Sequence, residues 1–174
     1  RVREGGLAIF PRQCADFAAF HDLRVNTVIA EPSAEVSAAA PMAGLVRFAV
    51  TQRGDATTIA FTDAEAQSLA FTLTRVSDGM AQNAVLAICA AMKLGVAAET
   101  IRARLAGWHP AAMRGEWRRE GSRLLYLDCY NANPAAMLDA LTNFSAQAPA
   151  DAPRLYVIGC MEELGPDAPR YHRE

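Results

Sequence analysis

The 174 residues are enough to bury a hydrophobic core, and a composition of 52% hydrophobic and 21% charged residues is ordinary for a globular α/β protein. The 17 basic and 19 acidic residues give a formal charge of −2. This charge offers no positive surface for nucleic acid or for an anionic membrane. The sequence has no apolar run of the roughly 18–20 residues that a membrane span needs and no secretory leader, so we expect a cytoplasmic protein.

The four cysteines, at positions 14, 89, 129 and 160, are far apart in the sequence. They form neither a CxxC pair nor a Cys/His spacing typical of a zinc site. We therefore expect reduced thiols rather than a disulfide framework.

The first 75 residues show strand patterns. The apolar runs 7–10 and 27–30 indicate short buried strands, and the stretch 14–21 between them is helix-like, which together predicts a βαβ unit. Alternating apolar residues at 46, 48 and 50 and at 59 and 61 flank Arg53-Gly54-Asp55, which predicts a hairpin with its turn at this triplet. Leu69, Phe71 and Leu73 predict one more half-buried strand.

The period then changes to that of helices. Apolar residues from Val85 to Met92 line one face of a helix that we expect to stop at Gly95, and a second helix carries Ile101 and Leu105. Trp108-His109-Pro110 breaks the pattern and marks a junction. We therefore predict one domain over residues 1–111 and another over residues 112–174.

The pattern of the second domain is strand, strand, helix, strand. Residues 116–119 and 124–127 indicate strands, residues 134–144 a helix, and the apolar run 155–158 a parallel strand buried on both faces. A helix between parallel strands implies a right-handed crossover. Ligands of such sheets bind beyond the carboxyl ends of the strands, here the segments that begin at Asp128 and Gly159.

The stretch 127–134, Leu-Asp-Cys-Tyr-Asn-Ala-Asn-Pro, leaves a strand and enters a helix. Asn133 and Pro134 are favoured helix N-cap and N1 residues, so a capping role is a simple explanation of Asn133. A carboxylate at the end of an apolar strand is harder to explain structurally, and Asp128 can accept hydrogen bonds from the hydroxyls of a ribose.

This stretch resembles the D-S-Y-N-A-N-P motif of the Mur ligase family. Three more features follow in the family's order. Asn83-Ala84 is similar to its H-N-x-x-N-A-L-A-A helix, Arg114 stands where it has the P-G-R arginine, and residues 159–165 with His172 resemble G-D-M-x-E-L-G followed by histidine. The resemblance implies the C-terminal part of a central ATPase domain, with a β-hairpin, followed by the first part of a Rossmann-like C-terminal domain. We accordingly expect an internal fragment of a longer chain.

The family's activity, ATP-dependent amide-bond formation in peptidoglycan precursor synthesis, is what the resemblance implies for the whole protein. The resemblance is strongest to the members that add D-alanyl-D-alanine to a UDP-linked muramoyl tripeptide through an acyl phosphate. It also implies that the full-length protein is a monomer. By the same resemblance, Asn83 contacts adenosine, Arg114 the ATP phosphates and Asp128 the ribose. The remaining expected nucleotide-binding residues, on the same side of the cleft, are Tyr130, Asn131 and Asn133. No residue of this chain is expected to be catalytic or to bind metal, because the phosphate-binding loop G-x-x-x-x-G-K-[ST] is absent and most Mg²⁺ ligands belong upstream.

Several positions depart from the family pattern. Gly79 stands in place of a histidine, Ala112-Met113 in place of Pro-Gly, Cys129 in place of serine and Cys160 in place of aspartate. Two other readings therefore stay open: another amino-acid ligase of this type, similar to folylpolyglutamate or cyanophycin synthetase, or a non-catalytic nucleotide-binding homologue. Structural roles also stay open for Asn83, at the start of a helix, and for Arg114, in a polar stretch.

Overall fold

The computed structural model describes residues 3, 5–20, 26–32, 45–62 and 68–173. The chain forms two compact units, one of Arg1–Arg75 with Met80–Trp108 and the other of Val76–Gly79 with His109–Glu174. The domain boundary after residue 111 stays a prediction, because a compact unit need not be a domain that folds alone. No helix in the described parts of the chain is both long and apolar enough to cross a membrane.

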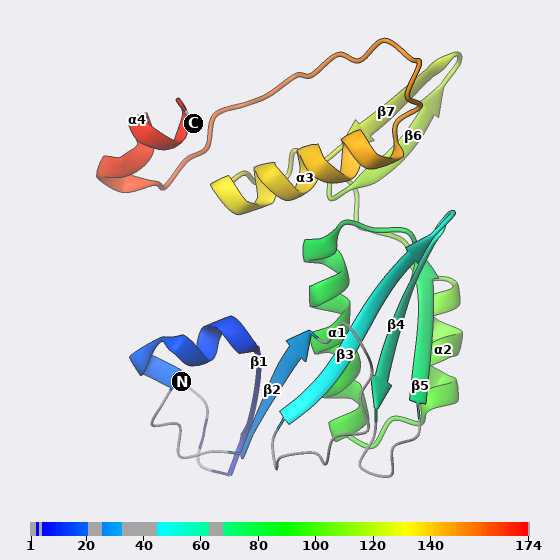
Figure 1. Cartoon of the computed structure of the whole chain (residues 1–174), viewed down its shortest axis with the longest axis vertical. Helices are drawn as coiled ribbons and strands as arrows, with labels where there is room; N and C mark the ends of the chain where they lie inside the picture. Colours follow the sequence, from blue (N-terminus) through cyan, green and yellow to red (C-terminus); the bar gives the residue numbers. More distant parts are fainter. Residues whose placement is uncertain (1–2, 4, 21–25, 33–44, 63–67, 174) are drawn as a thin grey trace. The chain divides into compact units, whose positions relative to one another are not determined.

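The first unit is built on a five-stranded sheet in the order β1-β2-β3-β4-β5 (Figure 1). Its strands are β1 (Leu7–Pro11), β2 (Asn26–Pro32), β3 (Leu45–Arg53), β4 (Ala56–Thr62) and β5 (Ser68–Thr74). The first three strands are parallel, and β4 and β5 continue the sheet antiparallel. The predicted hairpin is confirmed, with Arg53 pairing with Ala56 and Gly54 in the turn at a φ of 53°.

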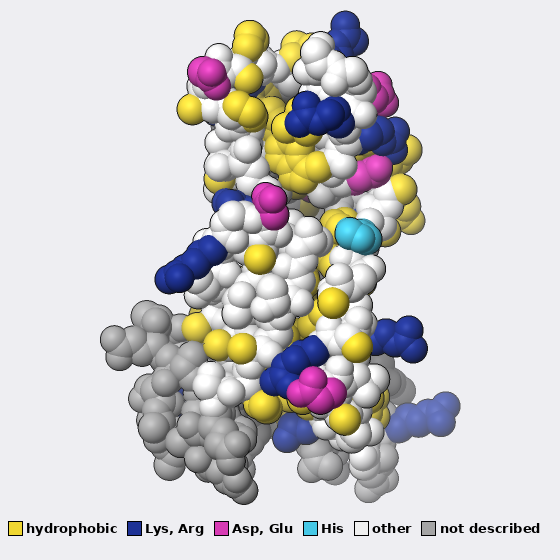
Figure 2. Space-filling view, turned by 90° about the vertical axis from the view of Figure 1, so that its right-hand side faces the viewer, with side chains coloured by type: hydrophobic (Ala, Val, Ile, Leu, Met, Phe, Trp, Pro, Cys, Tyr) yellow, Lys and Arg dark blue, Asp and Glu magenta, His cyan; other side chains and the backbone are white. Residues whose placement is uncertain are grey.

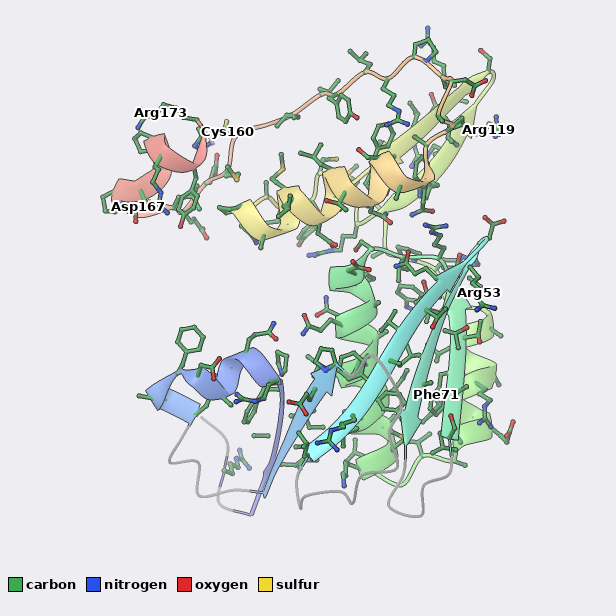
Figure 3. The ribbon with its side chains drawn as sticks, viewed as in Figure 1. Arg53, Phe71, Arg119, Cys160, Asp167 and Arg173 are labelled. Carbon is green, nitrogen blue, oxygen red and sulfur yellow. The ribbon has the colours of Figure 1, made fainter. Side chains whose placement is uncertain are left out.

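Two helices complete the first unit, α1 (Asp78–Lys93), whose first two residues belong to the second unit, and α2 (Ala98–Ala106). The buried side of α1 carries Val85, Ile88 and Cys89, as the helical period predicted. It ends before Gly95, whose φ of 81° is a conformation that favours glycine. The core of the sheet consists of fully buried side chains from neighbouring strands, Ile59, Phe61 and Phe71, of which Phe71 is labelled in Figure 3.

The helix predicted over residues 14–21 is wrong in the part that the structure describes. Two 3-10 turns, Arg12–Asp16 and Ala18–Phe20, stand there, separated by Phe17 in an extended conformation, and residue 21 lies outside the described residues. The ring of Phe20 packs against that of Phe10, with centroids 5.0 Å apart. Packing on the adjacent strand therefore prevails over a weak local helical preference.

The second unit contains an antiparallel hairpin, a long helix and a terminal segment with short helical turns. The elements are β6 (Glu116–Glu120), β7 (Arg123–Leu127), α3 (Pro134–Gln147), η3 (Gly165–Asp167) and α4 (Ala168–Tyr171). Its aromatic side chains form a partly exposed cluster: the ring centroid of Trp117 lies 4.9 Å from that of Tyr126 and 5.9 Å from that of Phe144, and the centroids of Phe144 and Tyr156 are 5.3 Å apart. The hairpin and the helix predicted for this part are confirmed, and the mixed α/β class is confirmed for the chain.

The buried parallel strand predicted over residues 155–158 is wrong. This segment has no strand partner in the structure, and Leu155 and Val157 are 85% and 90% exposed. A strand buried on both faces needs neighbours on both edges, and β6 and β7 pair only with each other among the described strands. The predicted right-handed crossover fails with it. Figure 2 shows hydrophobic side chains at the surface of this unit, in the upper part of the view.

Candidate functional site

Asp128 directly follows the last residue of β7 and is half-buried. Its Oδ2 lies 3.5 Å from the hydroxyl of Tyr126, and the carboxylate also accepts from the backbone N–H of Gly115. Burial raises the pKa of Asp128, and the negative charge of Asp139 raises it further. The two hydrogen bonds and the positive charge of Arg114 act in the opposite direction. Asp128 is thus a partly desolvated carboxylate that takes part in no ion pair among the described residues.

The loop before β6 is fastened to the loop after β7 through the carbonyl of Met113. This oxygen accepts from the backbone N–H groups of Cys129, at 3.0 Å, and Tyr130, at 3.2 Å. The N–H of Met113 donates to Oε2 of Glu116 at 3.2 Å. Met113 adopts a φ of 61°, which is rare for a side chain of this kind. This arrangement places Arg114 beside the segment that starts at Asp128.

The guanidinium carbon of Arg114 lies 3.9 Å from the ring centroid of Tyr130, so the two side chains are stacked. Both residues are exposed, Tyr130 by 66%. Cation–π stacking at exposed sites contributes about 0.5–1 kcal/mol. The structure thus brings three of the predicted site residues together: Arg114, Asp128 and Tyr130.

Asn133 and Asn131 use their side-chain oxygens on the local backbone. Oδ1 of Asn133 accepts from the N–H of Ala136 at 2.9 Å, so Asn133 is the N-cap of α3. Oδ1 of Asn131 accepts from the N–H of Ala132 at 2.9 Å. Both residues are exposed, and their predicted contacts with a nucleotide stay predictions.

Asn83 is an exposed residue of α1 and belongs to the first unit. The cluster of Arg114, Asp128 and Tyr130 lies within the second unit and forms without it. The predicted contact of Asn83 with adenosine stays a prediction.

Gly79 stands where the family has histidine. The carboxylate of Asp139 lies in the space that a side chain at this position would take up. The backbone N–H of Gly79 donates to Oδ1 of Asp139 at 3.1 Å. A Cβ added at this position would lie 2.7 Å from Oδ2 of the same residue. No side chain fits at position 79 while Asp139 of α3 keeps its position.

His172 makes a hydrogen bond to the motif-like segment 159–165. The N–H of Met161 donates to Nε2 of His172 at 2.9 Å, and Nδ1 of His172 lies 2.8 Å from the carbonyl of Ala168. With Nε2 as the acceptor, Nδ1 is the nitrogen that can donate to the carbonyl of Ala168. His172 therefore holds this turn together, and Cys160, labelled in Figure 3, lies just before it.

Three residues around Asp128 were not predicted: Tyr126, Asn143 and Gln147. Nδ2 of Asn143 donates to the hydroxyl of Tyr126 at 3.0 Å, and Nε2 of Gln147 donates to Oδ1 of Asn143 at 2.5 Å. The period-2 rule places Tyr126 on the same side of its strand as Asp128, which was an available signal. The two helical residues had none, because nothing in the sequence specifies which turn of α3 faces β7.

These groups suit part of a nucleotide. An ionised carboxylate can accept hydrogen bonds from ribose hydroxyls, and an exposed guanidinium can pair with phosphate. The described residues contain no group of three His, Cys, Asp or Glu side chains that could hold a metal ion.

Comparison with known proteins gives a family match for residues 113–174 and a fold for the whole chain. Residues 113–174 match the family model "Mur ligase, glutamate ligase domain". MurF from Acinetobacter baumannii superposes with a TM-score of 0.72 at 22% identity, over 98% of this chain and 35% of that one. MurF ligase from Thermotoga maritima, solved in complex with ADP, gives a TM-score of 0.72 at 19% identity, over 98% and 37%.

A third solved structure is UDP-N-acetylmuramoylalanyl-D-glutamyl-2,6-diaminopimelate--D-alanyl-D-alanyl ligase from Acinetobacter baumannii. It gives a TM-score of 0.58 at 23% identity, over 82% of this chain and 30% of that one. No curated protein sequence matches significantly.

The chain thus spans about a third of the length of the solved structures that it matches. The resemblance that the motifs predicted is confirmed. Residues 113–174 match the Mur ligase glutamate ligase domain model, and the chain as a whole has the fold of the matching part of MurF.

Proposed function

We propose that this chain is part of an ATP-dependent amide ligase of peptidoglycan precursor synthesis. The observation that carries the proposal is the grouping of Arg114, Asp128 and Tyr130 at the end of β7, inside a domain that matches the Mur ligase family. A carboxylate, a guanidinium and an aromatic ring are suited to one nucleotide's ribose, phosphate and base. One of the similar structures was solved with ADP, which supports an adenine nucleotide.

In the proposed reaction, ATP supplies the phosphoryl group that activates the carboxylate of a UDP-linked muramoyl peptide as an acyl phosphate, which an amine then attacks. Asp128 accepts the ribose hydroxyls, and Arg114 balances charge on the phosphates. Asn83, Tyr130, Asn131 and Asn133 line the nucleotide. These are binding and positioning roles, which account for much of the catalysis in phosphoryl transfer.

The finer part of the proposal concerns substrates and setting. D-alanyl-D-alanine is proposed as the incoming amine, because the similar structures are MurF and a D-alanyl-D-alanyl ligase. We further propose that Mg²⁺ accompanies ATP and is held mostly by residues outside this chain, and that the full-length protein is a cytoplasmic monomer.

The test is an ADP titration of the full-length protein by calorimetry. Asp128→Ala should weaken ADP binding by about 1–3 kcal/mol, because a charged hydrogen-bond acceptor is removed. Asp151→Ala, which removes an exposed carboxylate from a turn of the same unit, should leave the affinity unchanged. Equal affinities for Asp128→Ala and the unsubstituted protein would exclude the ribose role.

Substrate specificity is tested by ADP release. Turnover is expected with the UDP-linked tripeptide and D-alanyl-D-alanine, and not with a single amino acid in place of the dipeptide. Turnover with a single amino acid would instead favour another ligase of this type. ADP binding without any turnover would favour a non-catalytic homologue, in agreement with the substitutions at Gly79, Met113, Cys129 and Cys160.

A further inference from the structure

A directed chain of hydrogen bonds ends on Asp128. Gln147 donates to Asn143 at 2.5 Å, Asn143 donates to the Tyr126 oxygen at 3.0 Å, and the Tyr126 hydroxyl lies 3.5 Å from Oδ2 of Asp128. Because the amide of Asn143 gives its proton to the Tyr126 oxygen, the hydroxyl proton is free to point at the carboxylate. An ionised carboxylate can only accept hydrogen bonds. Each group in the chain therefore donates toward Asp128, from Gln147 through Asn143 and Tyr126.

The middle of this chain is fixed by packing. Asn143 is only 8% exposed, so its amide relies on protein partners rather than on water. The ring of Tyr126 packs against Trp117 and Phe144, with ring centroids 4.9 Å and 6.1 Å away. Burial raises the pKa of Tyr126 to about 12, so the hydroxyl keeps its proton at physiological pH. A protonated hydroxyl therefore lies 3.5 Å from Oδ2 of Asp128.

We propose that Tyr126 and Asn143 are positioning residues that orient the Asp128 carboxylate for a ribose. This inference rests on the proposed function. The Tyr126 hydroxyl lies beside Oδ2 and the Gly115 N–H donates to the same carboxylate, so two groups restrain its orientation next to Arg114, which stacks on Tyr130. Fixing a side chain before binding removes part of the entropy cost of ordering it later.

The charges around Asp128 make the effect measurable. Asp139 of α3 opposes ionisation, whereas Arg114, the Gly115 N–H and the Tyr126 hydroxyl favour it. Removing the hydroxyl takes away one group that favours the charged form, so the pKa of Asp128 should rise. If binding needs the ionised carboxylate, the loss of binding on acidification should then begin at a higher pH.

The experiment uses the full-length protein and the variant Tyr126→Phe, which keeps the packed ring. Tyr156→Phe is the matched control, because Tyr156 packs on the same cluster but takes no part in the hydrogen-bond chain. The Asp128 carboxyl is titrated by ¹³C NMR without ligand, and ADP affinity is measured by calorimetry between pH 4 and 8, roughly the range in which carboxylates and histidines titrate.

In Tyr126→Phe, the pKa of Asp128 should rise, the acid loss of ADP affinity should begin at a higher pH, and affinity at neutral pH should fall about two- to fivefold. Asn143→Leu should act in the same direction, and Tyr156→Phe should change none of these. If Tyr126 had only a structural role, its substitution would not shift the Asp128 titration and the pH dependence of ADP affinity together.

Two results would overturn the inference. If Asp128→Ala weakens ADP binding but Tyr126→Phe leaves the carboxyl titration and the affinity unchanged, the positioning role is wrong and the proposed function stands. If Asp128→Ala leaves ADP binding unchanged, the proposed function fails and the positioning role fails with it.

Discussion

At the scale of single residues, Met113 combines an unfavourable conformation with a structural task. Its φ of 61° costs a residue with a Cβ about 1–2 kcal/mol relative to an ordinary backbone conformation. Its carbonyl nevertheless accepts hydrogen bonds from the N–H groups of Cys129 and Tyr130, which lie in the loop that carries the candidate site. The family has glycine at this position, where the same conformation involves no such cost.

Met113→Gly should therefore stabilise the protein, by about 0.5–1 kcal/mol once the extra freedom of glycine in the unfolded chain is subtracted. The measurement is urea unfolding. Ala112→Gly is the matched control, because Ala112 does not have a positive φ and should lose stability. If both variants lost stability equally, strain at Met113 would be refuted.

Much of the candidate site could be predicted from the sequence because it lies in one continuous stretch. Asp128 was identified from a carboxylate that follows an apolar strand, and Arg114 and Tyr130 from the motif order. Tyr126, Asn143 and Asp139 were missed, because their roles depend on which turns of α3 face β7. That register is set by packing of the aromatic cluster and not by any local pattern.

At the scale of elements, α3 depends on its first residue. Asn133 caps the helix through its bond to the Ala136 N–H at 2.9 Å, and Pro134 supplies the first turn. Since α3 contributes Asn143 and Phe144 to the surroundings of Asp128, the cap supports the candidate site as well as the helix.

Asn133→Ala should lower the free energy of unfolding by about 1 kcal/mol, because one N–H at the helix start loses its partner. Asn133→Ser, which can still cap, should keep most of the stability. Thermal unfolding followed by circular dichroism measures both. Equal losses in the two variants would show that the Asn133 side chain does more here than cap the helix.

Strand patterns predicted the sheet of the first unit well, because alternate residues of β4 and β5 are buried and β3 carries the buried Phe48. The strand prediction for the apolar run 155–158 was wrong. Such a run shows that burial would be favourable, but it does not show that a neighbouring strand is present. Its side chains are exposed, and it has no strand neighbour among the described elements.

At the scale of the whole molecule, Asp128 links stability to pH. Its pKa is raised in the folded protein, so the folded state binds this proton more tightly than the unfolded state. The contribution to stability is therefore present in acid and is lost as the pH rises through the folded pKa. At neutral pH the ionised carboxylate lowers stability.

Asp128→Asn should accordingly raise Tm at pH 7 by about 1–3 °C, a shift that a gain below 1 kcal/mol produces in a protein of this size. The gain should shrink as the pH falls and Asp128 becomes protonated in the parent protein. Thermal unfolding at several pH values measures this, with Asp151→Asn as the exposed control. A gain that does not depend on pH would contradict the assignment.

The contact between Gly79 and Asp139 has an evolutionary consequence. Because a Cβ at position 79 would lie 2.7 Å from Oδ2 of Asp139, a histidine there requires the Asp139 carboxylate to leave its present position and its bond to the Gly79 N–H. The two positions should covary among homologues, with a small residue at 139 wherever 79 is histidine. An ancestor that carried the histidine would have had to change position 79 first, or both positions together, to reach the present pair.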